Sequence, residues 1–462
     1  MVRASIAAEK AGIPSASIIT SGFLKQAQAV GQSLGVQNLP LAEYPGVVAV
    51  DSSEELEKKV TGILVDNIIR AFTKPVLQAA RSREPEPDDV VFRGTLDEIQ
   101  EFFARRQWTD GLPVIPPTVD RVERFLRFTE RSSKEVIGIL LPERREATVW
   151  NVAVNGVMAG CRPEYMPVLL AAIEAIADPE FRIEDAGSTP GWEPLIILNG
   201  PIIRELNFNC EGGVMRVGRQ ANTSIGRFLR LFMRNVAGLR IPPGTTDKGT
   251  IADTFNVVLA ENEDVLAELG WESFSVARGF EPDENVVTVQ SVVFATAPIA
   301  SGGDKPQDHL DTFVAVFGGT MASWTHMAVN WAKYYPLLII NPGAARLFAQ
   351  NGLKKKDIQQ YLYDNSRVSV RSIETLAIQD GLTGFSVRRM VEHNLISKRF
   401  YESDDPDRMV PVFLNPEWIG IVISGDSGRN RSRGYAQNHE QGPPISKRIQ
   451  LPANWKRLLE AK

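Results

Sequence analysis

The sequence is organised around residues 207–238, which run NFNCEGGVMRVGRQANTSIGRFLRLFMRNVAG. The second half predicts an amphipathic helix, because its apolar residues recur at the spacing of one helical face. Asn222, Thr223 or Ser224 can accept the first free amides as an N-cap, so we expect the helix to begin near residue 224. Residues 195–200 predict a buried strand ahead of it. Strand, glycine-rich loop and helix together indicate an α/β fold with a candidate ligand site in the loop.

The loop contains residues that could carry chemistry. Cys210 and Glu211 are a candidate nucleophile and proton carrier. Arg219 and Arg227 flank the predicted helix start, where free N–H groups also favour binding of an anion. The glycines would let the backbone come close to such an anion. A reactive Cys210 needs a lowered pKa, which Arg216, Arg219 and the helix start would provide and Glu211 would oppose. The alternative is a buried structural cysteine in an ordinary turn. The predicted substrate-binding residues are Gly212, Gly213, Arg219, Asn222, Thr223 and Arg227.

Two further residues are candidates for catalysis. His326 lies between Trp324 and Trp331 and could act as an acid or base near neutral pH. A hydrogen-bonded core histidine is the alternative. Asp110 lies in a proline-rich loop, where an Asp-Gly turn is the alternative. No metal site is predicted, because the two cysteines fit no zinc-ligand spacing.

Composition restricts the class of protein. With 462 residues, 43% apolar and 23% charged, the chain is globular. A net charge of −5 predicts no nucleic-acid partner. We expect no membrane span, because no uncharged apolar run reaches 18 residues. Two cysteines and no apolar leader predict a cytoplasmic protein. The cofactor is unknown, since we find no dinucleotide or P-loop motif, and we find no internal repeat.

The order of patterns predicts two domains. Residues 1–80 alternate strand and helix, with strands at 15–20 and 47–50, and predict a small parallel β/α lobe. Capping boxes begin helices after Ser52 and Thr95. Residues 81–94 are charged and contain prolines, as in a linker. Residues 95–462 predict a large mixed α/β domain that carries the site and includes a helix around 250–270.

The N-terminal segment resembles a known family. Residues 9–20 (EKAGIPSASIIT), Phe23 and residues 39–45 (LPLAEYP) are similar to the UGSC family of selenoprotein-related bacterial proteins. Residues 95–462, with TDGLPVIPP at 109–117 and NCEGG at 209–213, resemble the large domain associated with that family. The resemblance implies an α/β fold and thiol or selenol redox chemistry. The family's selenocysteine- or cysteine-containing motif is absent, so either that chemistry is lost or a partner or upstream segment supplies it.

These observations leave three classes of function open. The first is an enzyme acting on a small anionic or carbonyl-bearing organic substrate, an oxidoreductase or a lyase, centred on residues 207–227. The second is a non-catalytic subunit of a larger complex, and the third is a small-molecule binding protein. Because the lobe has too few strands to cover a parallel sheet, we expect a homo-oligomer or a partner subunit.

Overall fold

The computed structural model describes residues 2–33, 36, 38–48, 50–73, 86, 89–141, 143–186, 191–240, 253–382 and 384–460. Contacts divide the chain into two compact units, and the fold is mixed α/β, as predicted. Unit 1 comprises Met1–Gly111, Ile139–Ala147 and Phe232–Lys248. Unit 2 comprises Leu112–Gly138, Thr148–Leu231 and Gly249–Lys462. Residues 81–85 and 87–88 of the predicted linker lie outside the described residues, and the domain boundary at 81–94 stays a prediction.

Unit 1 begins with the predicted β/α lobe. Strands β1 (Ser17–Thr20) and β2 (Leu41–Tyr44) pair in parallel, and Ser17 lies opposite Leu41. Ser52 caps the next helix through the predicted capping box with Glu55, and Thr95 does the same for α5 with Glu98. The helices of this unit are α1 (Val2–Lys10), α2 (Leu24–Ser33), α3 (Ser53–Lys59), the π-turn η2 (Val60–Leu64), α4 (Val65–Thr73) and α5 (Leu96–Arg105).

The second strand of the lobe lies earlier than predicted. We expected it at 47–50, but Val47, Val48 and Val50 lie outside any strand and are 53%, 50% and 78% exposed. Strand β2 instead buries Ala42 and Tyr44 on one face, at 0% and 1% exposure. The prediction was wrong because it took a continuous apolar run for the strand and missed the alternating run of equal length just before it.

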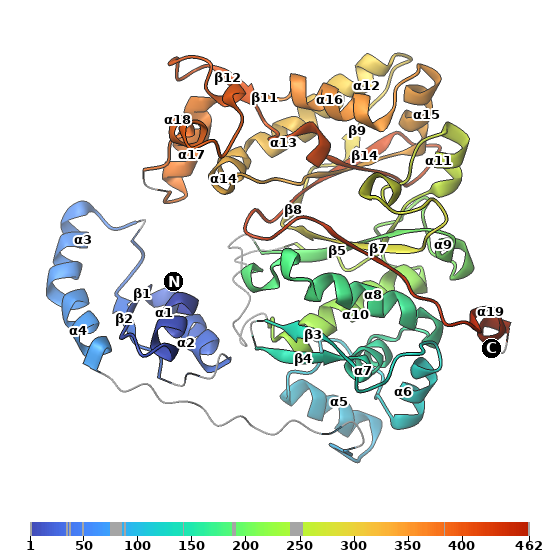
Figure 1. The fold of residues 1–462 in the computed structure, drawn as a ribbon, viewed down its shortest axis with the longest axis horizontal. Coiled ribbons are helices and arrows are strands. Elements are labelled where there is room, and N and C mark those ends of the chain that lie inside the picture. The colour runs from blue at the N-terminus through green and yellow to red at the C-terminus, as the bar shows by residue number, and fades with distance from the viewer. Residues whose placement is uncertain are drawn as a thin grey trace. The chain divides into compact units, whose positions relative to one another are not determined.

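Two sheets form the centre of unit 2. One has the strand order β15-β7-β5-β6, and the other has the order β13-β10-β14-β8 with β9 paired to β14. They share a hydrophobic core that contains Leu195, Val292, Leu337 and Val422. Helices α7, α8 and α10 lie on one side of these sheets, and α12, α15 and α16 lie on the other (Figure 1). The strands of these sheets are β5 (Glu193–Asn199), β6 (Leu259–Ala260), β7 (Val286–Val292), β8 (Phe294–Ala295), β9 (Ile299–Ala300), β10 (Leu337–Ile340), β13 (Gly420–Ile423), β14 (Arg431–Ala436) and β15 (Ile445–Arg448).

The two sheets repeat one topology. Strand β5 has a parallel neighbour, β6, and an antiparallel neighbour, β7. Strand β10 has the same two kinds of neighbour in β13 and β14. After β7 the chain enters β8, which pairs with β14 in the second sheet. After β14 the chain enters β15, which pairs with β7 in the first sheet. Our search for an internal repeat missed this because only short segments are alike, LIILN at 195–199 and LLIIN at 337–341.

The parallel strands bring four chain segments together where they end. Asn199 is the last residue of β5, and Asn341 is the first residue after β10. Glu261 directly follows β6, and Ser424 directly follows β13. The backbone N–H of Asn262 donates to the Ile423 carbonyl at 2.8 Å, which joins the ends of β6 and β13. Ends of parallel strands are common ligand sites in α/β proteins.

Two helices differ from the prediction. Helix α10 begins at Gln220 and not near 224, so Asn222, Thr223 and Ser224 lie inside its first turn. The expected helix around 250–270 is short: α11 spans only Glu263–Leu269, after strand β6, and residues 250–252 lie outside the described residues. The capping signal misled the first prediction, because Asn222 binds the loop backbone and not the helix amides.

Other elements complete the chain. In the part that the structure describes, none of the helices combines the length and apolar character needed to cross a bilayer. The other helices are α6 (Val119–Leu126), α7 (Val149–Ala159), α8 (Met166–Ala177), α9 (Ile202–Glu205), α10 (Gln220–Phe232), α12 (Pro306–Phe313), α13 (Gly319–Ala322), α14 (Thr325–Trp331), α15 (Pro342–Gln350), α16 (Lys355–Asn365), α17 (Val370–Gln379), α18 (Val387–Glu392) and α19 (Trp455–Glu460). The other strands are β3 (Val136–Leu140) paired with β4 (Arg145–Thr148), and β11 (Arg367–Ser369) paired with β12 (Met409–Pro411).

Candidate functional site

The predicted site loop, residues 207–219, packs against the turn that follows β13. The Cys210 carbonyl accepts from the Gly425 N–H at 3.1 Å and from the Ser424 hydroxyl at 3.0 Å. The same hydroxyl is 2.8 Å from the Ala260 carbonyl. The loop therefore lies at the ends of β6 and β13.

The Cys210 thiol has a pKa raised above its ordinary value. The thiol is half-buried, and desolvation is the main cause, followed by the negative charge of Glu211. The positive charge of Arg204 acts in the opposite direction and is outweighed. This direction is opposite to the one that a resting thiolate nucleophile needs.

The predicted anion-binding arginines have partners in the protein. Arg219 donates to the Asn207 side chain at 3.1 Å, and Arg227 donates to the Pro113 carbonyl at 2.9 Å. Asn222 is fully buried and holds the loop by exchanging hydrogen bonds with the Asn209 backbone at 2.8 and 2.9 Å. Thr223 accepts from the Gly218 N–H at 3.1 Å. Arg219, Asn222 and Thr223 therefore hold the loop in place, Arg227 binds the proline-rich segment instead, and Gly212 and Gly213 are exposed.

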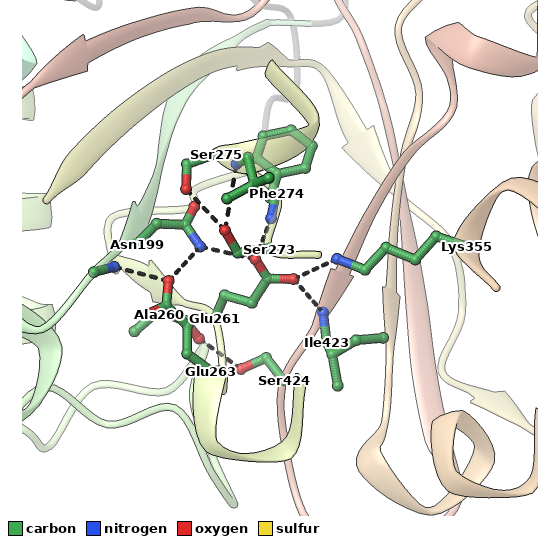
Figure 2. Close-up of polar contacts among 12 residues, drawn as sticks. Asn199, Ala260, Glu261, Glu263, Ser273, Phe274, Ser275, Lys355, Ile423 and Ser424 are labelled. Atoms are coloured by element: carbon green, nitrogen blue, oxygen red, sulfur yellow. Dashed lines mark hydrogen bonds and ion pairs between the residues drawn. The ribbon is translucent and has the colours of Figure 1, made fainter. Parts of the chain in front are cut away.

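A buried carboxylate lies at the end of β6, where the sequence analysis named no residue. Glu261 is 0% exposed, and both of its oxygens are hydrogen-bonded (Figure 2). One oxygen accepts from Lys355 Nζ at 2.9 Å and the Ile423 N–H at 3.1 Å. The other accepts from Asn199 Nδ2 at 2.8 Å and the Phe274 N–H at 2.6 Å. Four donors from four segments fix this carboxylate, so it positions Lys355 and cannot move freely.

A second carboxylate, Glu263, shares the Asn199 side chain with Glu261. Asn199 Nδ2 also donates to it, at 3.0 Å, and the Gly200 N–H donates at 2.8 Å. Desolvation raises its pKa above the ordinary value, and the charge of Glu261 adds to the effect. The negative charge of Glu263 in turn helps to raise the pKa of Cys210. Both groups therefore hold their protons more strongly than free side chains do.

A pocket lies at the start of α16, close to Glu261. It has a volume of about 400 Å³, and we call it the Trp418 pocket. Lys355 and Phe274, which both contact Glu261, form part of its wall. Four basic and two acidic side chains line it, an excess of positive charge: Arg278, Lys354, Lys355 and Lys356 against Glu272 and Glu417.

Aromatic rings form much of the remaining wall. The Tyr335 and Trp418 rings lie 5.0 Å apart, and Trp271 is a further lining residue. Arg278 stacks over the Phe274 ring at 5.6 Å and donates to the Ser446 hydroxyl at 2.8 Å. Among the described residues, no carboxylate pairs with Arg278. Desolvation raises the pKa of Tyr335, so its hydroxyl stays protonated at neutral pH.

The other two predicted catalytic residues lie elsewhere. His326 is 2% exposed, and its Nε2 lies 2.5 Å from Asp380 Oδ2. It is not among the residues that line the Trp418 pocket. Asp110 belongs to unit 1, whereas Cys210 and His326 belong to unit 2. The next residue, Gly111, has a φ of +90°, which a tight turn requires.

Neither Glu261 nor Lys355 stands out in the sequence as a site residue. A lone glutamate after a two-residue strand and a lysine in a run of three normally predict surface positions. Glu261 is joined to β13, because the Ile423 N–H at the end of that strand donates to it. Within the described ranges, no three His, Cys, Asp or Glu side chains gather as a metal site would require.

Comparisons with known proteins concern the N-terminal segment. No curated protein and no solved structure matches the chain. The resemblance that the sequence analysis drew from residues 9–51 is confirmed for this segment, and residues 1–74 match the UGSC family.

Proposed function

We propose that the protein is an enzyme acting on a small organic anion, and that the anion binds in the Trp418 pocket. One observation supports this most strongly. Arg278 lines an aromatic pocket of about 400 Å³ without a carboxylate partner among the described residues. Its Nε donates to Ser446 and its Nη2 to the Pro444 carbonyl, and the remaining N–H groups of the guanidinium can donate to a carboxylate or phosphate. The rings of Trp418 and Tyr335 suit a planar, apolar body on the ligand.

The same pocket favours proton transfer over electron transfer. The Tyr335 hydroxyl is a protonated donor, and Lys355 is a cation fixed by Glu261. A proton donor and a fixed cation can stabilise the negative charge that develops on a carbonyl oxygen. Of the two reaction classes that the sequence left open, the lyase class suits these groups better than the oxidoreductase class.

Binding of matched probes tests the proposal. We expect calorimetry to detect benzoate and phenyl phosphate but not the uncharged analogue benzamide. Arg278→Gln should weaken benzoate at least tenfold, or about 1.4 kcal/mol. Tyr335→Phe, which removes only the hydroxyl, should weaken it less. Arg429→Gln is the matched control, because Arg429 is an exposed arginine outside the pocket. Equal affinity of wild type and Arg278→Gln would refute the proposed binding site.

The Cys210 loop supports a second location for the same kind of chemistry. A protonated Cys210 and Glu263 could both donate protons to a substrate that reaches the loop. In this alternative the substrate is still a small organic anion, but the reaction takes place at residues 207–227. Cys210→Ser would then abolish turnover without changing benzoate affinity in the Trp418 pocket.

Another candidate function, a subunit of a larger complex, has one observation in its favour. The lobe exposes large apolar side chains, including Ile18 at 43%, Ile69 at 57% and Phe72 at 51%. Such a surface is typical of an interaction site. Light scattering on the purified chain tests this: a monomer at micromolar concentration that copurifies with no other polypeptide would contradict it.

A further inference from the structure

A second group of reactive side chains surrounds His439, in the segment between β14 and β15. The His439 ring lies 5.2 Å from the Trp324 ring and 5.8 Å from the Trp331 ring. Lys333 Nζ lies 5.9 Å from the Trp331 ring and donates to the Glu440 carbonyl at 3.2 Å. We call these four side chains, together with His326, the His439 cluster. None of them lines the Trp418 pocket.

The cluster contains buried polar atoms without protein partners. His439 is 3% exposed, and its Nδ1 has no hydrogen-bond partner among the described residues. The same holds for Nδ1 of His326. Buried polar atoms in folded proteins nearly always have partners, so these two nitrogens indicate a site that a polar ligand or water completes.

The backbone presents Lys333 to this cluster in a strained conformation. Ala332, the residue before it, has a φ of 52° and ends α14 in the left-handed region. A residue with a Cβ atom rarely adopts this conformation, which glycine would adopt without cost. The strain therefore suggests that the position of Lys333 matters for function.

We propose that Lys333 forms a Schiff base with a small aldehyde or ketone whose planar body lies against Trp324 and Trp331. The neutral amine of Lys333 attacks the carbonyl carbon and forms a carbon–nitrogen bond. The resulting carbinolamine loses the carbonyl oxygen as water, together with the two amine hydrogens. No oxidant or reductant is needed. The unpartnered nitrogen of His439, a residue close enough to Lys333 to feel its charge, is available to hydrogen-bond the carbinolamine hydroxyl.

Electrostatics in the cluster favour the neutral amine. Desolvation lowers the pKa of Lys333, and the positive charge of Arg182 lowers it further, against Asp185 and Glu440. Asp185 is paired with Arg182 at 2.5 Å, and Asp380 is 2.5 Å from His326. The pKa of His439 is lowered to about 3, so that ring is neutral at pH 7. A desolvated lysine beside another cation is a known way to make a nucleophilic amine.

Trapping of the imine in the wild-type chain tests the proposal. The chain is incubated at pH 7 with benzaldehyde and sodium cyanoborohydride, and peptide mapping gives the rate of N-benzylation at each lysine. We expect Lys333 to be modified several-fold faster than the exposed Lys398. Lys333→Arg should remove this adduct, and the control Lys398→Arg should leave it unchanged. Arg278→Gln should also leave it unchanged, which separates this site from the Trp418 pocket.

Two outcomes would overturn the proposal. The first is modification of Lys333 no faster than that of Lys398 in the wild-type chain, a result that does not depend on any variant folding. The second comes from competitive labelling with acetic anhydride across pH. If the pH of half-maximal reactivity for Lys333 is at or above that of Lys398, the amine is not activated.

Discussion

Replacement of Lys355 by methionine should destabilise unit 2 strongly. The change keeps the length of the side chain but removes the cation that lies 2.9 Å from the fully buried Glu261. Removing one partner of a buried ion pair typically costs about 3–5 kcal/mol, because the other charge stays desolvated. Three backbone or amide donors to Glu261 remain, so we expect the lower end, about 3 kcal/mol.

A double-mutant cycle separates this effect from a general loss of packing. Glu261→Gln in the Lys355→Met background removes the unpaired charge and should recover about 2 kcal/mol, a coupling in the range for groups in direct contact. Urea unfolding followed by tryptophan fluorescence gives the four free energies of unfolding. A cost below about 0.5 kcal/mol for Lys355→Met, the scale of an ordinary surface substitution, would refute the reasoning, as would strictly additive effects.

Three other predictions concern His439, Cys210 and Gly442. The pKa of His439 is about 3 in the folded state against an ordinary 6.5, so the free energy of unfolding should fall by about 1.4 kcal/mol per pH unit as the pH drops from 6.5 to 3. In His439→Gln the urea midpoint should depend less on pH. An unchanged pH dependence would contradict the prediction. Iodoacetamide at pH 7 should alkylate Cys210 more slowly than free glutathione, because the pKa of Cys210 is raised. It should alkylate Cys161 only after unfolding, because burial raises the pKa of that thiol to about 12. Faster reaction at Cys210 than at glutathione would restore the nucleophile role. Gly442→Ala would place its Cβ 1.6 Å from the Glu180 carbonyl oxygen and should lower the free energy of unfolding by about 3 kcal/mol. The control Gly319→Ala has open space around its Cβ and should leave the free energy of unfolding unchanged. Similar thermal midpoints for both variants would exclude the predicted clash.

Local signals in the sequence predicted elements well where one physical cause dominates. The capping boxes at Ser52 and Thr95 marked the starts of two helices. Helix α10 was placed four residues late, because Asn222 is a strong capping residue that here serves the loop instead. Such competition between a local cap and a tertiary hydrogen bond is invisible in the sequence.

The candidate site was only partly predictable, for the same reason. The loop 207–219 was recognised from its glycines, Cys210 and position after a buried strand. Lys355 and Glu261 lie 94 residues apart, and Ile423 lies 162 residues from Glu261. Nothing local links a charged residue to so distant a partner, since charged side chains are expected at the surface. The direction of the Cys210 pKa depended on burial, which the sequence did not give.

An anomalous-scattering experiment tests the proposed function most directly. A crystal of the protein soaked in 4-bromobenzoate should show a bromine peak in the Trp418 pocket, against the exposed side of the Trp418 and Tyr335 ring pair, with the carboxylate toward Arg278 and Lys355. Crystals of Arg278→Gln, soaked under the same conditions, should lose most of that peak. A pocket without bromine, or a peak of equal height in both crystals, would contradict the assignment of this pocket as the site of an organic anion.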